Sequence, residues 1–176
     1  YTSRCFWVWS SARRRRTRGG GVGGSRGIGR TCKAAFPKGL GGPGAGRPGW
    51  TPASNLADDR LGDDTPEALR GALRQPTPER IFQIKRALEA GLEVGEISDL
   101  TGIDSWFLSQ MSELIGAERA YAALPIVERD VLWQMKRMGF SDRQLAELRR
   151  ESEAAGRARR IGFGIGTAFT TGYTFA

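Results

Sequence analysis

"EISDLTGIDSWFLSQMSELI", residues 96–115, decides what kind of fold this chain adopts. Gly102 separates two helical patterns, because glycine commonly lies just beyond the end of a helix. Asp104 then caps a second helix, whose apolar residues recur at the spacing of a buried face. These residues are Phe107, Leu108, Met111, Leu114 and Ile115. A helix, a tight turn and a helix also outline a DNA-binding motif, so the contacts of the second helix determine the class of protein.

The second helix lacks the side chains that read DNA. Base contacts need Arg, Lys, Asn or Gln at exposed positions near the helix start, and only Gln110 qualifies. No Lys or Arg occurs between Ile103 and Glu118. Trp106 stands beside Phe107 in the first turn, so apolar surface spreads over more than one face. The pattern therefore predicts a helix that packs against protein, and argues against a nucleic-acid partner.

Composition narrows the possible functions further. The 176 residues carry a formal net charge of +8, but the excess lies in residues 1–50, which contain no acidic residue. The arginine run at 13–18 keeps a helix-turn-helix-like nucleic-acid-binding protein with a basic tail open as the alternative. The chain has no His, which removes imidazole bases and the commonest metal ligand. The longest apolar run, Cys5 to Trp9, is too short to span a bilayer, so a cytoplasmic setting without membrane contact is expected.

The glycine motif "GGSRGIGR", residues 23–30, resembles the cofactor-binding turn of short-chain dehydrogenases. That chemistry requires a buried strand before the turn and a helix after it. The preceding stretch is rich in arginine, and Pro37 and Gly39 are expected to break a following helix. No Tyr-x-x-x-Lys motif follows. The motif therefore does not predict a dinucleotide site, and residues 1–50 are expected to be irregular and largely mobile.

Regular helix signals begin at Thr65. Thr65-Pro66 and Thr77-Pro78 each place a cap before a proline at the first helical position, and the second predicts a helix over 78–90 that ends at Gly91. Further helices are predicted at 94–100, after Asp104, from Pro125 to Gly139, and after Ser141, which forms a capping box with Gln144. The expected fold is mainly α: a small bundle of five or six short helices with irregular, disordered N-terminal and C-terminal flanks.

Two long motifs resemble one family. "ERIFQIKRALEAGLEVGEISDLTGIDSWFLSQMSELI" (79–115) and "MKRMGFSDRQLAEL" (135–148) are similar to the oligomerisation domain of the carbamoyl-phosphate synthase large chain. The flanks, 22–40 and 164–176, look like degraded copies of neighbouring family sequence. Ser105 stands where the family usually has Pro, and Glu93 where it often has a Ser cap.

The resemblance implies a position within a larger enzyme. Residues 1–75 would be the tail of the first ATP-grasp half, 76–160 the helical oligomerisation domain, and 161–176 a linker toward the second ATP-grasp half. The parent enzyme would make carbamoyl phosphate from bicarbonate and ammonia with ATP and magnesium. Its partners would be the flanking halves, further copies of the chain, and a glutaminase small chain.

No catalytic, cofactor-binding or metal-ligating residue is assigned in this chain, because the family's nucleotide-binding motif lies upstream. The segment is therefore expected to act as a non-catalytic connector. The residues expected to pack or dock are Trp106, Phe107, Leu108, Met111 and Phe140. Of these, Trp106 is expected to be partly exposed and to contact another part of the full-length chain or another subunit.

Overall fold

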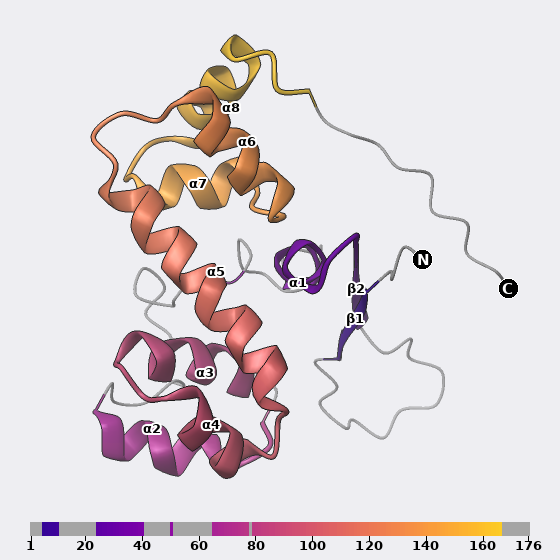
Figure 1. The fold of residues 1–176 in the computed structure, drawn as a ribbon, viewed down its shortest axis with the longest axis vertical. Coiled ribbons are helices and arrows are strands. Elements are labelled where there is room, and N and C mark those ends of the chain that lie inside the picture. Colours follow the sequence, from indigo (N-terminus) through magenta and orange to yellow (C-terminus); the bar gives the residue numbers. More distant parts are fainter. Residues whose placement is uncertain (1–4, 11–23, 41–49, 51–64, 78, 167–176) are drawn as a thin grey trace, which may run out of the picture.

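The structure, a computed structural model, describes residues 5–10, 24–40, 50, 65–77 and 79–166. Most of these residues are helical, which confirms the expected mainly α class (Figure 1). The helices in the described part are α1 (Cys32–Leu40), α2 (Pro66–Leu73), α3 (Arg80–Glu89), α4 (Val94–Thr101), α5 (Ser105–Ala123), α6 (Arg129–Arg137), α7 (Asp142–Leu148) and α8 (Glu153–Gly162). Two strands, β1 (Cys5–Ser10) and β2 (Gly24–Gly29), precede them.

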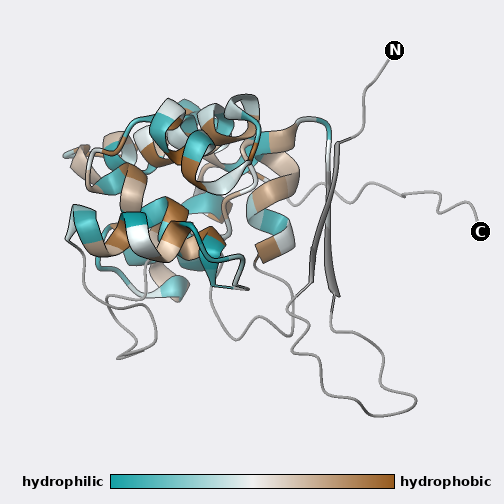
Figure 2. Ribbon diagram, turned by 90° about the horizontal axis from the view of Figure 1, so that it is seen from below, coloured by the Kyte–Doolittle hydropathy of each residue, from teal (hydrophilic) through white to brown (hydrophobic). Residues whose placement is uncertain are grey.

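The long helix α5 connects two groups of shorter helices. Helices α2 to α4 lie around its N-terminal half, and α6 to α8 lie around its C-terminal end (Figure 1). Polar and apolar residues alternate around these helices, as expected when each covers a core with one face (Figure 2). Leu73, Ile84, Ile97, Leu108 and Leu114 are among the fully buried side chains of the shared core.

The predicted helix ends after Thr65 are largely confirmed. The Thr65 hydroxyl accepts a hydrogen bond from the Ala68 N–H at 3.4 Å, so it caps α2. Gly102 ends α4 with φ 69°, a left-handed conformation that favours glycine. Ser141 and Gln144 form the predicted capping box, with reciprocal bonds of 3.1 and 3.0 Å.

Two predicted helix starts are wrong, and one helix was missed. Helix α3 begins at Arg80, not at residue 78, and the Thr77 hydroxyl is buried without a hydrogen-bond partner instead of capping it. Pro125 does not open a helix, because α6 begins only at Arg129 after the extended N-cap Glu128. Helix α8 was not predicted; its Ser152 cap accepts from Ala155 at 3.2 Å. Its glycines and arginines hide the apolar period that identifies a helix.

The expectation that residues 1–50 are irregular is wrong for residues 5–10 and 24–40. Strands β1 and β2 pair antiparallel, and α1 continues through Pro37 and Gly39, the residues expected to break it. A side chain at Gly27 would place its Cβ 2.0 Å from the Ala35 carbonyl oxygen of α1. Glycine therefore allows direct backbone contact between strand and helix. The predictions for residues 11–23, 41–49, 51–64 and 167–176 lie outside the described residues.

Helix α1 is packed onto the helical body as well as onto the sheet. Its Phe36 ring meets the Trp50 ring edge-on, with centroids 4.8 Å apart. Lys33 forms an ion pair with Glu113 of α5. A Cβ at Gly139, after α6, would lie 2.7 Å from the Ala34 carbonyl oxygen. Among the helices of the described ranges, none has the length and apolar character needed to cross a membrane.

Candidate docking surface and the contacts that position it

The N-terminal turn of α5 carries two exposed aromatic side chains. The Asp104 carboxylate accepts a hydrogen bond from the Trp106 N–H at 2.8 Å and so fixes where the helix begins. Trp106 is 51% exposed and Phe107 is 39% exposed. Their rings meet edge-on, with centroids 4.9 Å apart and planes at 83°. The pair therefore presents a preformed apolar surface, which we call the Trp106–Phe107 surface.

The other residues named from the sequence lie elsewhere. Leu108 and Met111 point into the core, and so does Phe140, which follows α6. The predicted buried face is wrong at Phe107, because Leu108 fills the core position next to it. The structure thus separates the five residues into two exposed aromatics and three core residues.

A small cavity lies between α1 and α5 beside Phe107. It has a volume of about 10 Å³. Its lining residues are Cys32, Lys33, Phe36, Phe107, Gln110, Met111 and Leu114. Such a volume corresponds to about one water molecule, so this cavity does not accommodate a nucleotide.

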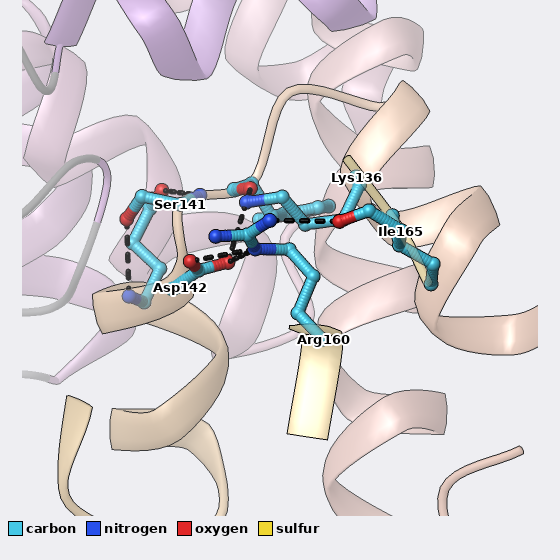
Figure 3. Close-up of polar contacts among 7 residues, drawn as sticks. Lys136, Ser141, Asp142, Arg160 and Ile165 are labelled. Carbon is cyan, nitrogen blue, oxygen red and sulfur yellow. Dashed lines mark hydrogen bonds and ion pairs between the residues drawn. The ribbon is translucent and has the colours of Figure 1, made fainter. Parts of the chain in front are cut away.

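A network of charged side chains joins α6, α7 and α8 (Figure 3). Asp142 accepts hydrogen bonds from Lys136 at 2.9 Å and from Arg160 at 2.8 Å. Arg160 also donates to the Ile165 carbonyl at 2.7 Å, and Lys136 to that of Phe140 at 2.8 Å. Burial acts to raise the pKa of Asp142, but the hydrogen bonds from Lys136 and Arg160 outweigh it, so the pKa is lowered. The network fixes the path by which the chain leaves α8.

A second charged cluster lies inside the core. Lys85 of α3 is 1% exposed and bonds to Glu118 of α5 at 2.5 Å and to the Trp50 carbonyl at 2.6 Å. The Lys85 ammonium also lies 5.1 Å from the Trp50 ring centroid, and the Trp50 indole N–H donates to Ile81 at 3.1 Å. Burial raises the pKa of Glu118 despite the opposing effect of Lys85. Lys85 therefore joins Trp50, which lies against α3, to Glu118 of α5.

A third cluster closes the C-terminal end of α5. Arg149 donates to the carbonyl of Leu124 at 2.8 Å and lies over the ring of Tyr121. Arg159 pairs with Glu151 through two bonds of 2.8 and 2.7 Å. Burial raises the pKa of Tyr121, although the hydrogen bond from Arg159 and its charge oppose this. The cluster attaches α7 and α8 to the end of α5.

None of the three clusters is among the features predicted from the sequence, but one signal for the Lys85 cluster was available. Ile81, Ile84 and Leu88 define the inner stripe of α3, and Lys85 falls at the same helical spacing. A charge on a buried stripe needs a partner of opposite charge. Within the part of the chain that the structure describes, no group of three or more His, Cys, Asp or Glu side chains is arranged to hold a metal ion.

The fold defines a helical packing domain with exposed aromatic side chains on α5. The chain belongs to the family of the carbamoyl-phosphate synthetase large chain, oligomerisation domain, whose model matches residues 26–164. The resemblance seen in residues 79–115 and 135–148 is thereby confirmed. The matched family gives no support to the nucleic-acid-binding alternative.

Similar proteins include three large chains. The carbamoyl phosphate synthase large chain of Gemmatimonas aurantiaca is 53% identical over 144 residues, which cover 82% of this chain and 13% of that protein. The large chain from a Nostoc species is 36% identical, over 85% of this chain and 13% of its own length. The chloroplastic arginine-specific large chain of Arabidopsis thaliana is 34% identical, over 82% of this chain and 12% of its own. The chain therefore spans about an eighth of the length of these relatives.

Proposed function

We propose that this chain is the helical connector of a carbamoyl-phosphate synthase large chain. In this proposal it packs between two ATP-grasp halves and contributes to self-association, while catalysis takes place in the flanking halves. The parent reaction would be the ATP-dependent formation of carbamoyl phosphate from bicarbonate and ammonia, in the cytoplasm. ATP and magnesium would bind outside this segment, and a glutaminase small chain would deliver the ammonia.

The observation that carries the proposal is the exposure of the Trp106–Phe107 surface. Trp106 is half exposed. Large aromatic side chains are usually buried in a core or in an interface, and the core of this domain does not bury Trp106. Trp50, by contrast, is buried against Phe36 and Lys85. A rigid, exposed aromatic pair on a small domain marks a contact site. Its occupant in this proposal is an adjoining part of the full-length chain or another subunit.

The test compares Trp106→Ala with Trp50→Ala in urea unfolding of the 176-residue chain. Truncating a core tryptophan typically lowers the free energy of unfolding by roughly 3–5 kcal/mol. The Trp106 variant should lose well under that amount of stability, and the Trp50 variant about that amount. In the full-length enzyme, Trp106→Ala should weaken association in sedimentation experiments. A loss above about 3 kcal/mol in the fragment, with assembly unchanged, would place Trp106 in the core and end the docking proposal.

The connector position has a separate genomic test. Extending the reading frame on both sides should reveal ATP-grasp sequence before and after this segment. Finding none on either side would contradict the proposal.

A further inference from the structure

Helix α6 carries a second exposed aromatic surface, which none of the sequence predictions included. Trp133 is 42% exposed on a helix whose Leu132 and Met135 are buried in the core. Arg137, one turn later, stacks its guanidinium over the Trp133 ring, 4.5 Å from the centroid. Tryptophan and arginine are the residue types most enriched among the strongest contributors to protein interfaces. Stacking also restrains both side chains before any partner binds, which reduces the entropy lost on binding.

Two of the exposed charges on α6, those of Asp130 and Arg137, lie symmetrically about Trp133 and Gln134. Asp130 lies about one turn before the midpoint between residues 133 and 134, and Arg137 lies the same distance after it. Residues three and four apart share a helix face, so Asp130, Trp133, Gln134 and Arg137 form one exposed strip, the α6 strip. Asp130 is negative and Arg137 is positive, so the strip is complementary to its own reversed copy.

We infer that the α6 strip binds the α6 strip of a second copy of this chain, antiparallel and around a two-fold axis at residues 133 and 134. An isologous contact of this kind requires a patch that matches itself when rotated by 180°. In this arrangement Asp130 of each copy faces Arg137 of the other, and Trp133 faces Gln134. The inference rests on the proposed self-association and names the surface and the partner for one such contact.

Both charged groups are available for such a pairing. The Asp130 side chain is 84% exposed, and its ion pair with neighbouring Arg129 is long, at 3.4 Å. Arg137 contacts Trp133 through the face of its planar guanidinium. Its N–H groups point along the edge of that plane and can donate to a carboxylate of the second copy while the stacking persists.

The α6 strip lies away from the Trp106–Phe107 surface. Helix α6 belongs to the helices around the C-terminal end of α5, whereas Trp106 lies in the first turn of α5 (Figure 1). A contact between two short helices buries little area, so the α6 pair alone should be weak. It would add to any other contact between the same subunits, because linked contacts reinforce one another.

The test uses charge reversal in the 176-residue chain, with sedimentation measured across roughly 1 μM to 1 mM. Asp130→Arg and Arg137→Glu each place like charges opposite one another twice, and each should raise the dimer dissociation constant at least about tenfold. An equimolar mixture of the two variants restores both pairs, and it should form a heterodimer within about threefold of the wild-type constant. Trp133→Ala should weaken the dimer without changing its charge.

Matched controls separate this effect from net charge and misfolding. Asp99→Arg on α4 and Arg157→Glu on α8 change the charge equally at exposed positions and should leave the dimer unchanged. Far-UV circular dichroism and urea midpoints verify that every variant folds. A wild-type chain that stays monomeric to 1 mM, or single variants that associate as wild type does, would overturn the inference. So would a mixture that fails to dimerise.

The two proposals fail differently. Association that persists unchanged in the α6 variants but is lost in Trp106→Ala would remove the α6 pairing and leave the proposed function intact. If the equimolar mixture associates no more tightly than either single variant, while the wild-type chain still dimerises, the antiparallel register is wrong but self-association stands.

Discussion

Asp142 is the residue whose charge matters most to the C-terminal helices. Its mostly buried carboxylate forms ion pairs with both Lys136 and Arg160. Two positive charges are therefore neutralised by one carboxylate. Removing one partner of a buried pair is costly, because the remaining charge stays out of water without compensation.

We predict that Asp142→Asn lowers the free energy of unfolding by about 1–3 kcal/mol at pH 7. The pKa of Asp142 is lowered on folding from its ordinary value of 3.8. Its stabilising contribution is therefore complete above 3.8 and is lost as the pH falls through the lowered folded value. Urea titrations from pH 7 to pH 2 should show the wild-type advantage shrinking below about pH 4. An advantage independent of pH would contradict this, and Asp99→Asn, at an exposed position, is the control.

For the buried Lys85–Glu118 pair, the prediction concerns the coupling between two opposite charges. Lys85→Met should destabilise the chain by roughly 3–5 kcal/mol, since it leaves the buried Glu118 carboxyl without its cation. Glu118→Leu should cost less, because the Lys85 ammonium keeps its ion pair with Glu89 at 3.9 Å and its hydrogen bond to the Trp50 carbonyl. The double variant should lose much less than the sum of the two losses, because both charges are then absent. A double-mutant cycle in urea measures the difference. Additive losses would mean that the two groups are not coupled.

At the scale of elements, glycines have contrasting roles. Gly29 in β2 faces the backbone of α1, where a Cβ would lie 2.5 Å from the Ala35 nitrogen. Gly116, inside α5, has open space around its missing Cβ. One glycine is required by close packing, and the other only weakens its helix.

We predict opposite effects for the two alanine substitutions. Gly29→Ala should separate β2 from α1 and increase amide exchange in residues 32–40. Gly116→Ala should stabilise the chain by about 1 kcal/mol, through better helix propensity. Hydrogen exchange with urea unfolding measures both. Unchanged protection of α1 in Gly29→Ala would show that the strand does not support the helix.

These elements show what sequence reasoning could reach. Local chemistry identified the helix ends at Thr65, Gly102, Asp104 and Ser141, because a cap depends on neighbouring residues only. It failed for α1, since the helix continues through Pro37, and the need for the glycines of β2 appears only when β2 and α1 are packed against each other. It predicted that Trp106 is partly exposed, because one buried face needs only Phe107 or Leu108, and the structure shows that Leu108 takes that core position. It could not find the α6 strip, whose partner arrangement depends on which face of α6 is buried.

At the scale of the whole molecule, the chain spans about an eighth of the length of the large chains that it resembles. Because we propose that the reaction takes place in the flanking halves, the purified 176-residue chain should neither hydrolyse ATP nor form carbamoyl phosphate. A phosphate-release assay with magnesium and bicarbonate measures this. Hydrolysis above background that copurifies with the chain through two further columns would contradict the assignment.

Helix α5 also spans the distance between the two helix groups without a break (Figure 1). Its 19 residues span about 28 Å at 1.5 Å per residue. Asp104 caps its first turn, and Arg149, which follows α7, donates a hydrogen bond to the Leu124 carbonyl at its other end. A tilt of about 5° at Trp106 would therefore displace the far end by about 2.5 Å, roughly half a helical turn. If a neighbour tilts the first turn of α5, we therefore expect the helices at its far end to move with it, together with the segment that leaves α8.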